Sequence, residues 1–97
     1  MKQAYSSGNF VRLSTIFGEV FGKIVEISDD RVILKISDMD AVQNIPIKLF
    51  NDVFAETLDI DEVQFNLLYC GYGISRTATR ALVELVLLFN HKEFNHG

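Results

Sequence analysis

The residue types best suited to chemistry lie close together in the second half of this 97-residue chain, in the stretch Cys70-Gly71-Tyr72-Gly73-Ile74-Ser75-Arg76-Thr77. It holds the only cysteine, two glycines, and an arginine followed by a hydroxyl. A thiolate is a nucleophile, and a guanidinium can hold two phosphate oxygens in a fork. Glycine-rich backbone can also turn its N–H groups toward a phosphate at the start of a helix. These residue types suit phosphate chemistry.

The stretch from Cys70 to Thr79 resembles the signature loop of the dual-specificity and tyrosine phosphatases, which has a cysteine, five residues with a central glycine, an arginine, and a serine or threonine. The resemblance implies that Cys70 is the nucleophile, Arg76 the phosphate clamp, and Thr77 the hydroxyl that eases thiolate departure. It also implies Asp40 as the upstream general acid. That family builds its loop on a parallel sheet with helices on both faces, whereas the residues before Cys70 predict hairpins. We therefore favour no catalytic residue, and keep a cysteine-dependent phosphatase as an alternative.

Metal chemistry has less support in the sequence. His91 and His96 are five residues apart, which is the wrong interval for one helical face. A metal site needs three or four convergent ligands, and no second pair accompanies these histidines. Asp38 and Asp40 lie in a polar turn, where aspartates usually bond to nearby backbone. We predict neither a metal nor a cofactor.

Acidic residues dominate the middle of the chain. The net charge is −4, and between residues 37 and 75 the only base is Lys48. Nucleic-acid binding through the phosphate backbone needs clustered Lys and Arg, so we do not expect a nucleic-acid partner. An acidic flank instead favours basic partners and speeds their encounter. The predicted partner-binding residues are Asp52, Glu56, Asp59, Asp61 and Glu62.

Hydrophobic alternation predicts strands over residues 9–17, 20–27, 31–36, 42–49 and 62–69. Three sets of residues are expected to face inward: Val11, Leu13 and Phe17; Phe21, Val25 and Ile27; and Val32, Leu34 and Ile36. Pro46 cannot donate to a strand ladder, which predicts that its strand lies at an edge or that its Pro46 position is unpaired. Residues 50–58 fit either one or two helical turns or a packed loop. Residues 75–90 fit a helix or a strand, and we favour the helix.

These elements predict one domain over residues 1–97, mainly β. The expected fold is a small antiparallel barrel or curled sheet of four to six strands, SH3-, Sm- or OB-like, with a C-terminal helix. The hairpin from Gly22 to Leu34 resembles the first motif of Sm-type proteins, without the asparagine expected after the turn. That resemblance implies a second alternative, an RNA-binding ring subunit.

The leading hypothesis is a small non-enzymatic acidic module that binds a basic protein, as inhibitors, immunity proteins and antitoxins do. Exposed strand edges also predict self-association into a homo-oligomer. No run of about 18 apolar residues and no apolar leader stretch is present, so no membrane association is expected. A single cysteine suits a reducing compartment, which predicts a cytoplasmic location.

Overall fold

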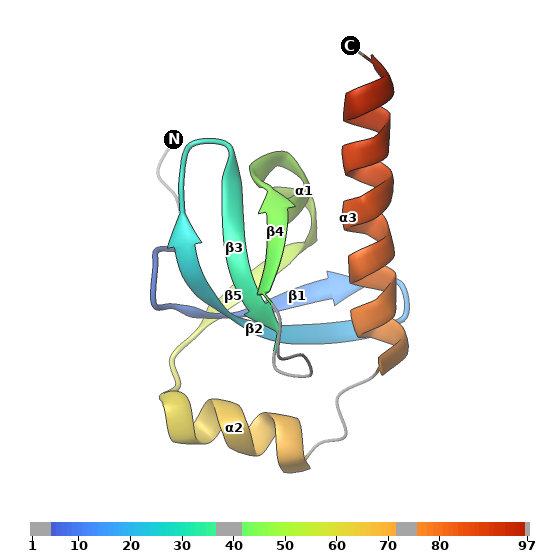
Figure 1. Cartoon of the computed structure of the whole chain (residues 1–97). Helices are drawn as coiled ribbons and strands as arrows, with labels where there is room; N and C mark the ends of the chain where they lie inside the picture. Colours follow the sequence, from blue (N-terminus) through green and yellow to red (C-terminus); the bar gives the residue numbers. More distant parts are fainter. Residues whose placement is uncertain (1–4, 37–41, 72–75, 97) are drawn as a thin grey trace.

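The computed structural model describes residues 5–36, 42–71 and 76–96, and shows one antiparallel sheet with helices beside it (Figure 1). The elements in chain order are β1 (Phe10–Thr15), β2 (Gly18–Ile27), β3 (Arg31–Ile36), β4 (Val42–Pro46), α1 (Ile47–Val53), β5 (Phe54–Leu58), α2 (Glu62–Gly71) and α3 (Arg76–His96). This architecture confirms the prediction of a mainly β fold with a C-terminal helix.

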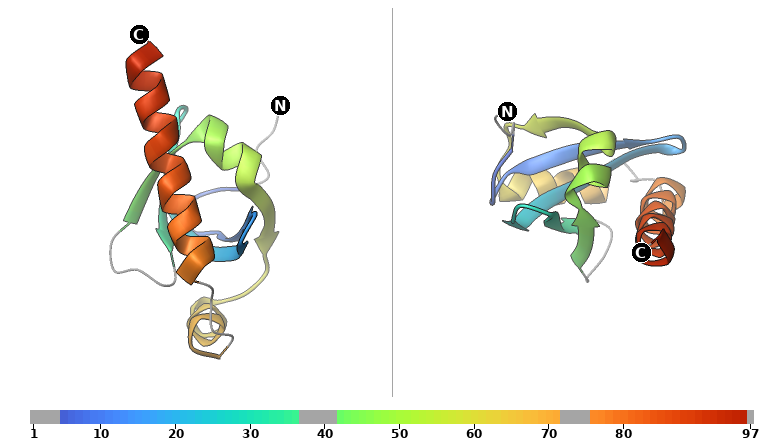
Figure 2. Two further views of the ribbon diagram at one scale, coloured as in Figure 1. Left: turned by 90° about the vertical axis from the view of Figure 1, so that its right-hand side faces the viewer. Right: turned by 90° about the horizontal axis from the view of Figure 1, so that it is seen from above.

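The five strands form a curled sheet that does not close into a barrel. Their order is β4-β3-β2-β1-β5, and every neighbouring pair is antiparallel. β4 and β5 are the two edge strands, and α1 carries the chain from one edge to the other (Figure 2). The edge position predicted from Pro46 is confirmed, since β4 is the first strand in the sheet order and pairs with β3.

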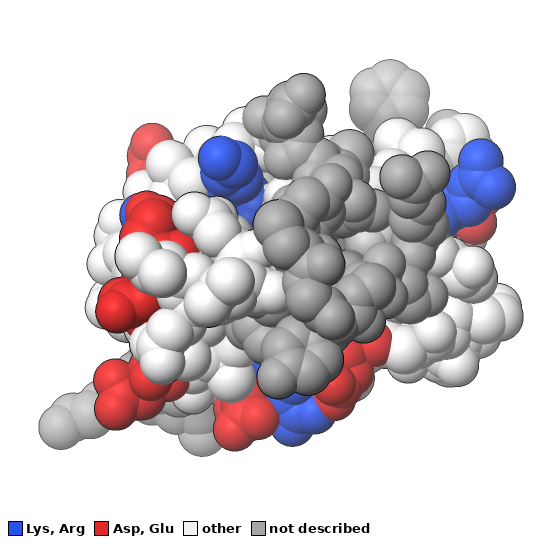
Figure 3. All heavy atoms as spheres, turned by 90° about the horizontal axis from the view of Figure 1, so that it is seen from below, with Lys and Arg blue, Asp and Glu red and all other residues white. Residues whose placement is uncertain are grey.

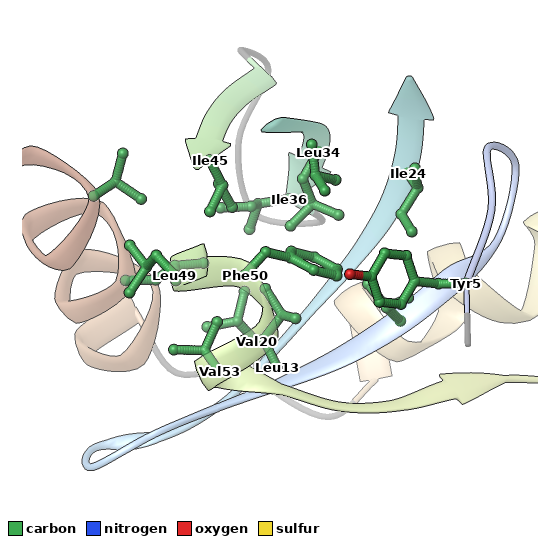
Figure 4. Packing of buried hydrophobic residues seen from close by; sticks show 14 of the residues in the cluster. Tyr5, Leu13, Val20, Ile24, Leu34, Ile36, Ile45, Leu49, Phe50 and Val53 are labelled. Atoms are coloured by element: carbon green, nitrogen blue, oxygen red, sulfur yellow. The ribbon is translucent and has the colours of Figure 1, made fainter. Parts of the chain in front are cut away.

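The core lies on the inner face of the sheet, under α1 and α3. Val11 and Leu13 of β1 are completely buried, as are the three predicted inward residues of β3. Phe50 of α1 fills the centre of this cluster, with its ring 4.8 Å from that of Tyr5 (Figure 4). Among the side chains that the structure describes, the fully buried ones are those of Val11, Leu13, Val20, Ile24, Val32, Leu34, Ile36, Ile45, Phe50, Ala78 and Leu82.

The predicted inward face of β2 is wrong. Val20 and Ile24 are completely buried, whereas Phe21 is half-buried and Val25 is exposed. Gly22, between the two buried residues, has no side chain to reveal the alternation, and the pairing with β3 shifts register between Ile24 and Glu26. This irregularity places the half-buried Ile27 against the core, although its parity differs from that of Ile24.

The predicted inward position of Phe17 is also wrong. This residue lies in the turn between β1 and β2, past the end of the strand, and its side chain is exposed.

The segment 42–49 is strand only as far as Pro46. The backbone N–H of Ile47 donates to the carbonyl of Asp30 at 2.8 Å, and α1 starts there. α1 buries Leu49, Phe50 and Val53. The apolar spacing at the start of the segment 50–58, which fits either helical turns or a packed loop, therefore belongs to a helix. The same ambiguous segment also contains β5.

The predicted strand over residues 62–69 is wrong, because this segment is the helix α2. Asp61 and Gln64 cap it reciprocally: the N–H of Gln64 donates to Asp61 Oδ1 at 2.8 Å, and the N–H of Asp61 donates to Gln64 Oε1 at 2.9 Å. Phe65 is buried, whereas Val63 and Leu67 are exposed, so the alternation did not mark a buried face.

Residues 76–96 form the helix α3, which confirms the preference for helix over strand. Ala78, Leu82 and Val86 are buried against the sheet and follow one another at intervals of four residues. The C-terminal turns of α3 extend past the end of the sheet (Figure 1).

Candidate protein-binding surface

The five predicted partner-binding acids lie along one continuous part of the chain, from α1 through β5 to the start of α2. Asp52 is in α1, Glu56 is in β5, and the other three surround the start of α2. All five side chains are exposed. Seen from below, acidic side chains gather on one side of the molecule (Figure 3). We call the five residues Asp52, Glu56, Asp59, Asp61 and Glu62 the acidic surface.

Glu56 is held by an ion pair on the outer face of the sheet. Arg12 of β1 is opposite Glu56 in the ladder, and its Nε lies 2.8 Å from Glu56 Oε1. The N–H at this Nε does not point at the carboxylate, so the contact is an ion pair without a directional hydrogen bond. Arg12 also pairs with Glu19 of β2. One arginine thus joins three strands and partly neutralises Glu56.

Asp61 and Glu62 hold α2 in place. Asp61 is the cap described above, and Glu62 Oε1 lies 3.0 Å from Nζ of Lys23 on β2. The same Lys23 ammonium lies 5.5 Å from the ring centre of Phe10, which stacks on Phe65 of α2 at 4.8 Å. These two acids therefore have structural partners inside the chain.

Asp52 and Asp59 have no ion pair within 4.0 Å among the residues that the structure describes. Both are exposed, one on α1 before β5 and the other just after it. Lys48 lies one turn before Asp52 on α1 without forming an ion pair with it. Among the described residues, the acidic surface thus divides into two acids without an ion pair and three with a structural partner inside the chain.

The phosphatase residues are only partly visible. Asp40 lies outside the described residues, and so do the side chains of Cys70 and Arg76. Thr77 is exposed in the first turn of α3. The backbone at Cys70 is helical and belongs to α2, whereas the signature loop follows a strand. The described strands are all antiparallel, so the parallel scaffold implied by the resemblance is absent from this part of the chain.

Two further findings concern the described ranges alone. They contain no group of three or more His, Cys, Asp or Glu side chains placed to share a metal ion. None of their helices combines the length and apolar character that crossing a membrane requires.

The sequence reasoning missed the apolar residues of the β1–β2 turn. Ile16 is 91% exposed and Phe17 is 56% exposed, at positions assigned above to a half-buried strand. Gly18 has a φ of 128°, a conformation that favours glycine and marks the end of the turn. The glycine directly after two large apolar residues was the signal that could have placed them at a hairpin tip.

No protein-family profile, curated protein or solved structure matches this chain.

Proposed function

We propose that this protein is a small non-enzymatic module that binds a basic protein through the acidic surface. The observation that carries the proposal is the pair Asp52 and Asp59, two exposed carboxylates that have no ion pair among the described residues and that precede and follow the edge strand β5. An inhibitor, immunity or antitoxin-type protein uses such a surface to capture an enzyme whose own surface is basic.

The physical basis of this binding is electrostatic steering. Complementary charge raises the association rate over the roughly 10 Å range that salt leaves unscreened at about 0.1 M. Glu56 and Glu62 contribute less to this field, because Arg12 and Lys23 already neutralise them. A basic side chain of the partner gains less from pairing with either glutamate, because an internal base already lies beside it. We therefore rank Asp52 and Asp59 above Glu56 and Glu62, and we set Asp61 apart because its carboxylate caps α2.

The test starts with affinity capture from the native cell to identify a partner, followed by stopped-flow association with that purified partner. The variant Asp52→Lys/Asp59→Lys should lower the association rate constant by about tenfold or more. The control Glu26→Lys/Asp29→Lys makes the same change in net charge at two exposed positions near the β2–β3 turn. It should change the rate by about twofold or less.

Two outcomes contradict the proposal. Equal losses in both double variants would mean that net charge, and not this surface, governs the encounter. Unchanged association in Asp52→Lys/Asp59→Lys would remove these residues from the interface. A separate titration with single-stranded RNA at low salt tests the Sm-like alternative, and saturable binding there would favour that function instead.

A further inference from the structure

The tip of the β1–β2 hairpin and one side of α3 together form an exposed apolar surface. Thr15, Ile16 and Phe17 form one wall of a hollow of about 200 Å³, next to α3. The opposite wall consists of Ala81, Glu84, Leu85 and Leu88. Leu88 is 65% exposed. We call these seven residues the hairpin–α3 face.

The hairpin tip holds its apolar side chains in a defined position. Thr15 pairs with Gly18, which leaves Ile16 and Phe17 as the two turn residues. The Thr15 hydroxyl donates to the carbonyl of Gly18 at 2.8 Å and accepts from the N–H of Phe17 at 3.2 Å. Two-residue turns usually carry Gly, Asn, Asp or Ser. Ile16 and Phe17 therefore form an apolar protrusion whose backbone is fixed by the hydrogen bonds of the turn.

α3 is apolar on more sides than the sheet covers. Leu82 and Val86 face the core, but Leu85 and Leu88 lie beside them on the hairpin–α3 face, and Leu87 is also exposed. Helices that are apolar on most sides are usually buried on most sides. The C-terminal turns of α3 also extend beyond the sheet (Figure 2).

We propose that a second copy of this chain covers the hairpin–α3 face, in a two-fold dimer in which the Ile16 side chain of each copy enters the hollow of the other. A two-fold interface requires one patch to be complementary to itself. The hairpin–α3 face meets this requirement, because it carries a protruding apolar tip and an apolar hollow side by side. This inference is independent of the partner proposed for the acidic surface.

Charge also favours a second copy over a strongly charged partner. The hairpin–α3 face contains one acid, Glu84, and the exposed Arg80 lies one turn before it on α3. When two α3 helices pack antiparallel about a two-fold axis, the order of these charges is reversed in the other copy. Arg80 of one copy then approaches Glu84 of the other. The net charge of −4 opposes association only weakly, since the acidic surface lies in α1, β5 and α2.

The size of the face predicts a reversible dimer. The largest apolar patch on a monomer usually covers about 300–600 Å². Two such patches facing each other bury about 600–1,200 Å² in total, at or below the lower limit of about 1,200 Å² for specific interfaces. We expect a dissociation constant on the order of micromolar.

Sedimentation equilibrium over a range of protein concentrations tests the dimer. The wild-type chain should change from monomer to dimer at micromolar concentration, whereas Ile16→Lys/Leu88→Lys should remain monomeric with an unchanged circular dichroism spectrum. The matched control is Val63→Lys/Leu67→Lys on α2, where the two side chains are 66% and 60% exposed. This control adds the same charge and should still form dimers.

Crosslinking tests the contact directly. In a Cys70→Ser background, equal amounts of an Ile16→Cys chain and a Leu88→Cys chain should form the mixed disulfide at least about tenfold faster than Val25→Cys with Leu88→Cys. A wild-type chain that stays monomeric at hundreds of micromolar would overturn the proposal, and so would equal crosslinking of the two mixtures. Binding of the wild-type monomer to phosphatidylglycerol vesicles, lost in Ile16→Lys/Leu88→Lys, would assign the face to a membrane and overturn it too.

Discussion

Gly22 shows how closely the sheet backbone approaches the core. A Cβ atom added at this position would lie 2.9 Å from both Cγ and Cδ2 of Leu34 on the neighbouring strand. Leu34 is completely buried, so its side chain has no free space into which to move. Glycine is needed here for space, because the inner face of the sheet is already filled by the leucine.

The substitution Gly22→Ala should lower the free energy of unfolding by about 1–3 kcal/mol through overpacking. In a Leu34→Ala background the same substitution should cost much less, because the clashing atoms are gone. Urea unfolding of the four proteins in this double-mutant cycle measures the difference. Additive effects would show that the cost of Gly22→Ala does not come from Leu34.

Tyr5 is the buried ionisable side chain that connects the N-terminal segment to α1. Its hydroxyl donates a hydrogen bond to Asn51 Oδ1, and its ring packs against Phe50 and Phe54. Burial raises the pKa of the Tyr5 hydroxyl above its usual value of 10.0. The folded state therefore favours the neutral phenol.

This raised pKa predicts a loss of stability at alkaline pH. Below pH 10 the phenol is neutral in both the folded and unfolded states, and its contribution to stability is complete. As the pH rises above 10, the unfolded chain ionises first, and the contribution is lost as the pH passes through the pKa of the folded state. Tyr5→Phe should cost about 1 kcal/mol at neutral pH, from the lost hydrogen bond, and should flatten this decline. Thermal unfolding of both proteins between pH 8 and about pH 11.5 measures the effect, and parallel pH profiles would contradict it.

At the scale of elements, α2 contacts the sheet through few of its described side chains, residues 62–67. Phe65 is the buried residue on its described part, and stacks on Phe10 on the outer face of the sheet, outside the main core cluster. The ion pair between Lys23 and Glu62 is exposed, and such pairs contribute about 1 kcal/mol or less. Among the described side chains of α2, residues 62–67, Phe65 therefore supplies most of the attachment.

Phe65→Ala should release α2 and leave the sheet folded. Hydrogen exchange should show protection lost over residues 62–67 while the amides of β1 to β3 keep theirs. Glu62→Gln is the matched control, because it weakens the ion pair and keeps the aromatic contact. It should leave the protection of α2 nearly unchanged. Equal loss of protection in the sheet and in α2 would show that this helix is part of the cooperative core.

The same elements show how far the sequence could predict the fold. The inward faces of β1 and β3 and the helix α3 could be predicted because their buried apolar residues recur at a regular spacing. The edge position of β4 could be predicted because Pro46 cannot donate to a strand ladder. The inward face of β2 could not be predicted, because Gly22 interrupts the alternation and the pairing shifts register after Ile24. α2 was predictable in principle, from the capping pair Asp61 and Gln64, but the alternating apolar residues 63–69 suggested a strand.

The sequence could predict which acids make up the candidate site, but not which of them are paired with a base inside the chain. The sequence shows where acids are dense, and all five predicted acids are exposed. It does not show that Arg12 and Lys23, far away in the chain, compensate Glu56 and Glu62. Such pairs depend on which strands become neighbours, which only the folded sheet decides.

At the scale of the whole molecule, the acidic surface and the hairpin–α3 face should respond oppositely to salt. Screening weakens the attraction of a basic partner, whereas burial of apolar surface depends little on ionic strength, and sulfate strengthens it. Raising sodium sulfate from 0.05 to about 0.5 M should slow partner association and tighten the dimer. Stopped-flow mixing and sedimentation in the same buffers measure both responses. If the two responses have the same sign, one of the surfaces is wrongly assigned.

The strand order also has a consequence for how the chain folds. β1, β2, β3 and β4 are joined by successive hairpins, but β5 reaches its place beside β1 only after the chain has passed through all of them, so that Phe10 meets Leu58. Local hairpins form in microseconds, whereas a pairing between distant segments must first overcome the entropy of closing the intervening loop. We therefore predict that the closure of β5 onto β1 is the last step of folding, and that until then the chain exposes an unprotected edge of β1 to other nascent chains.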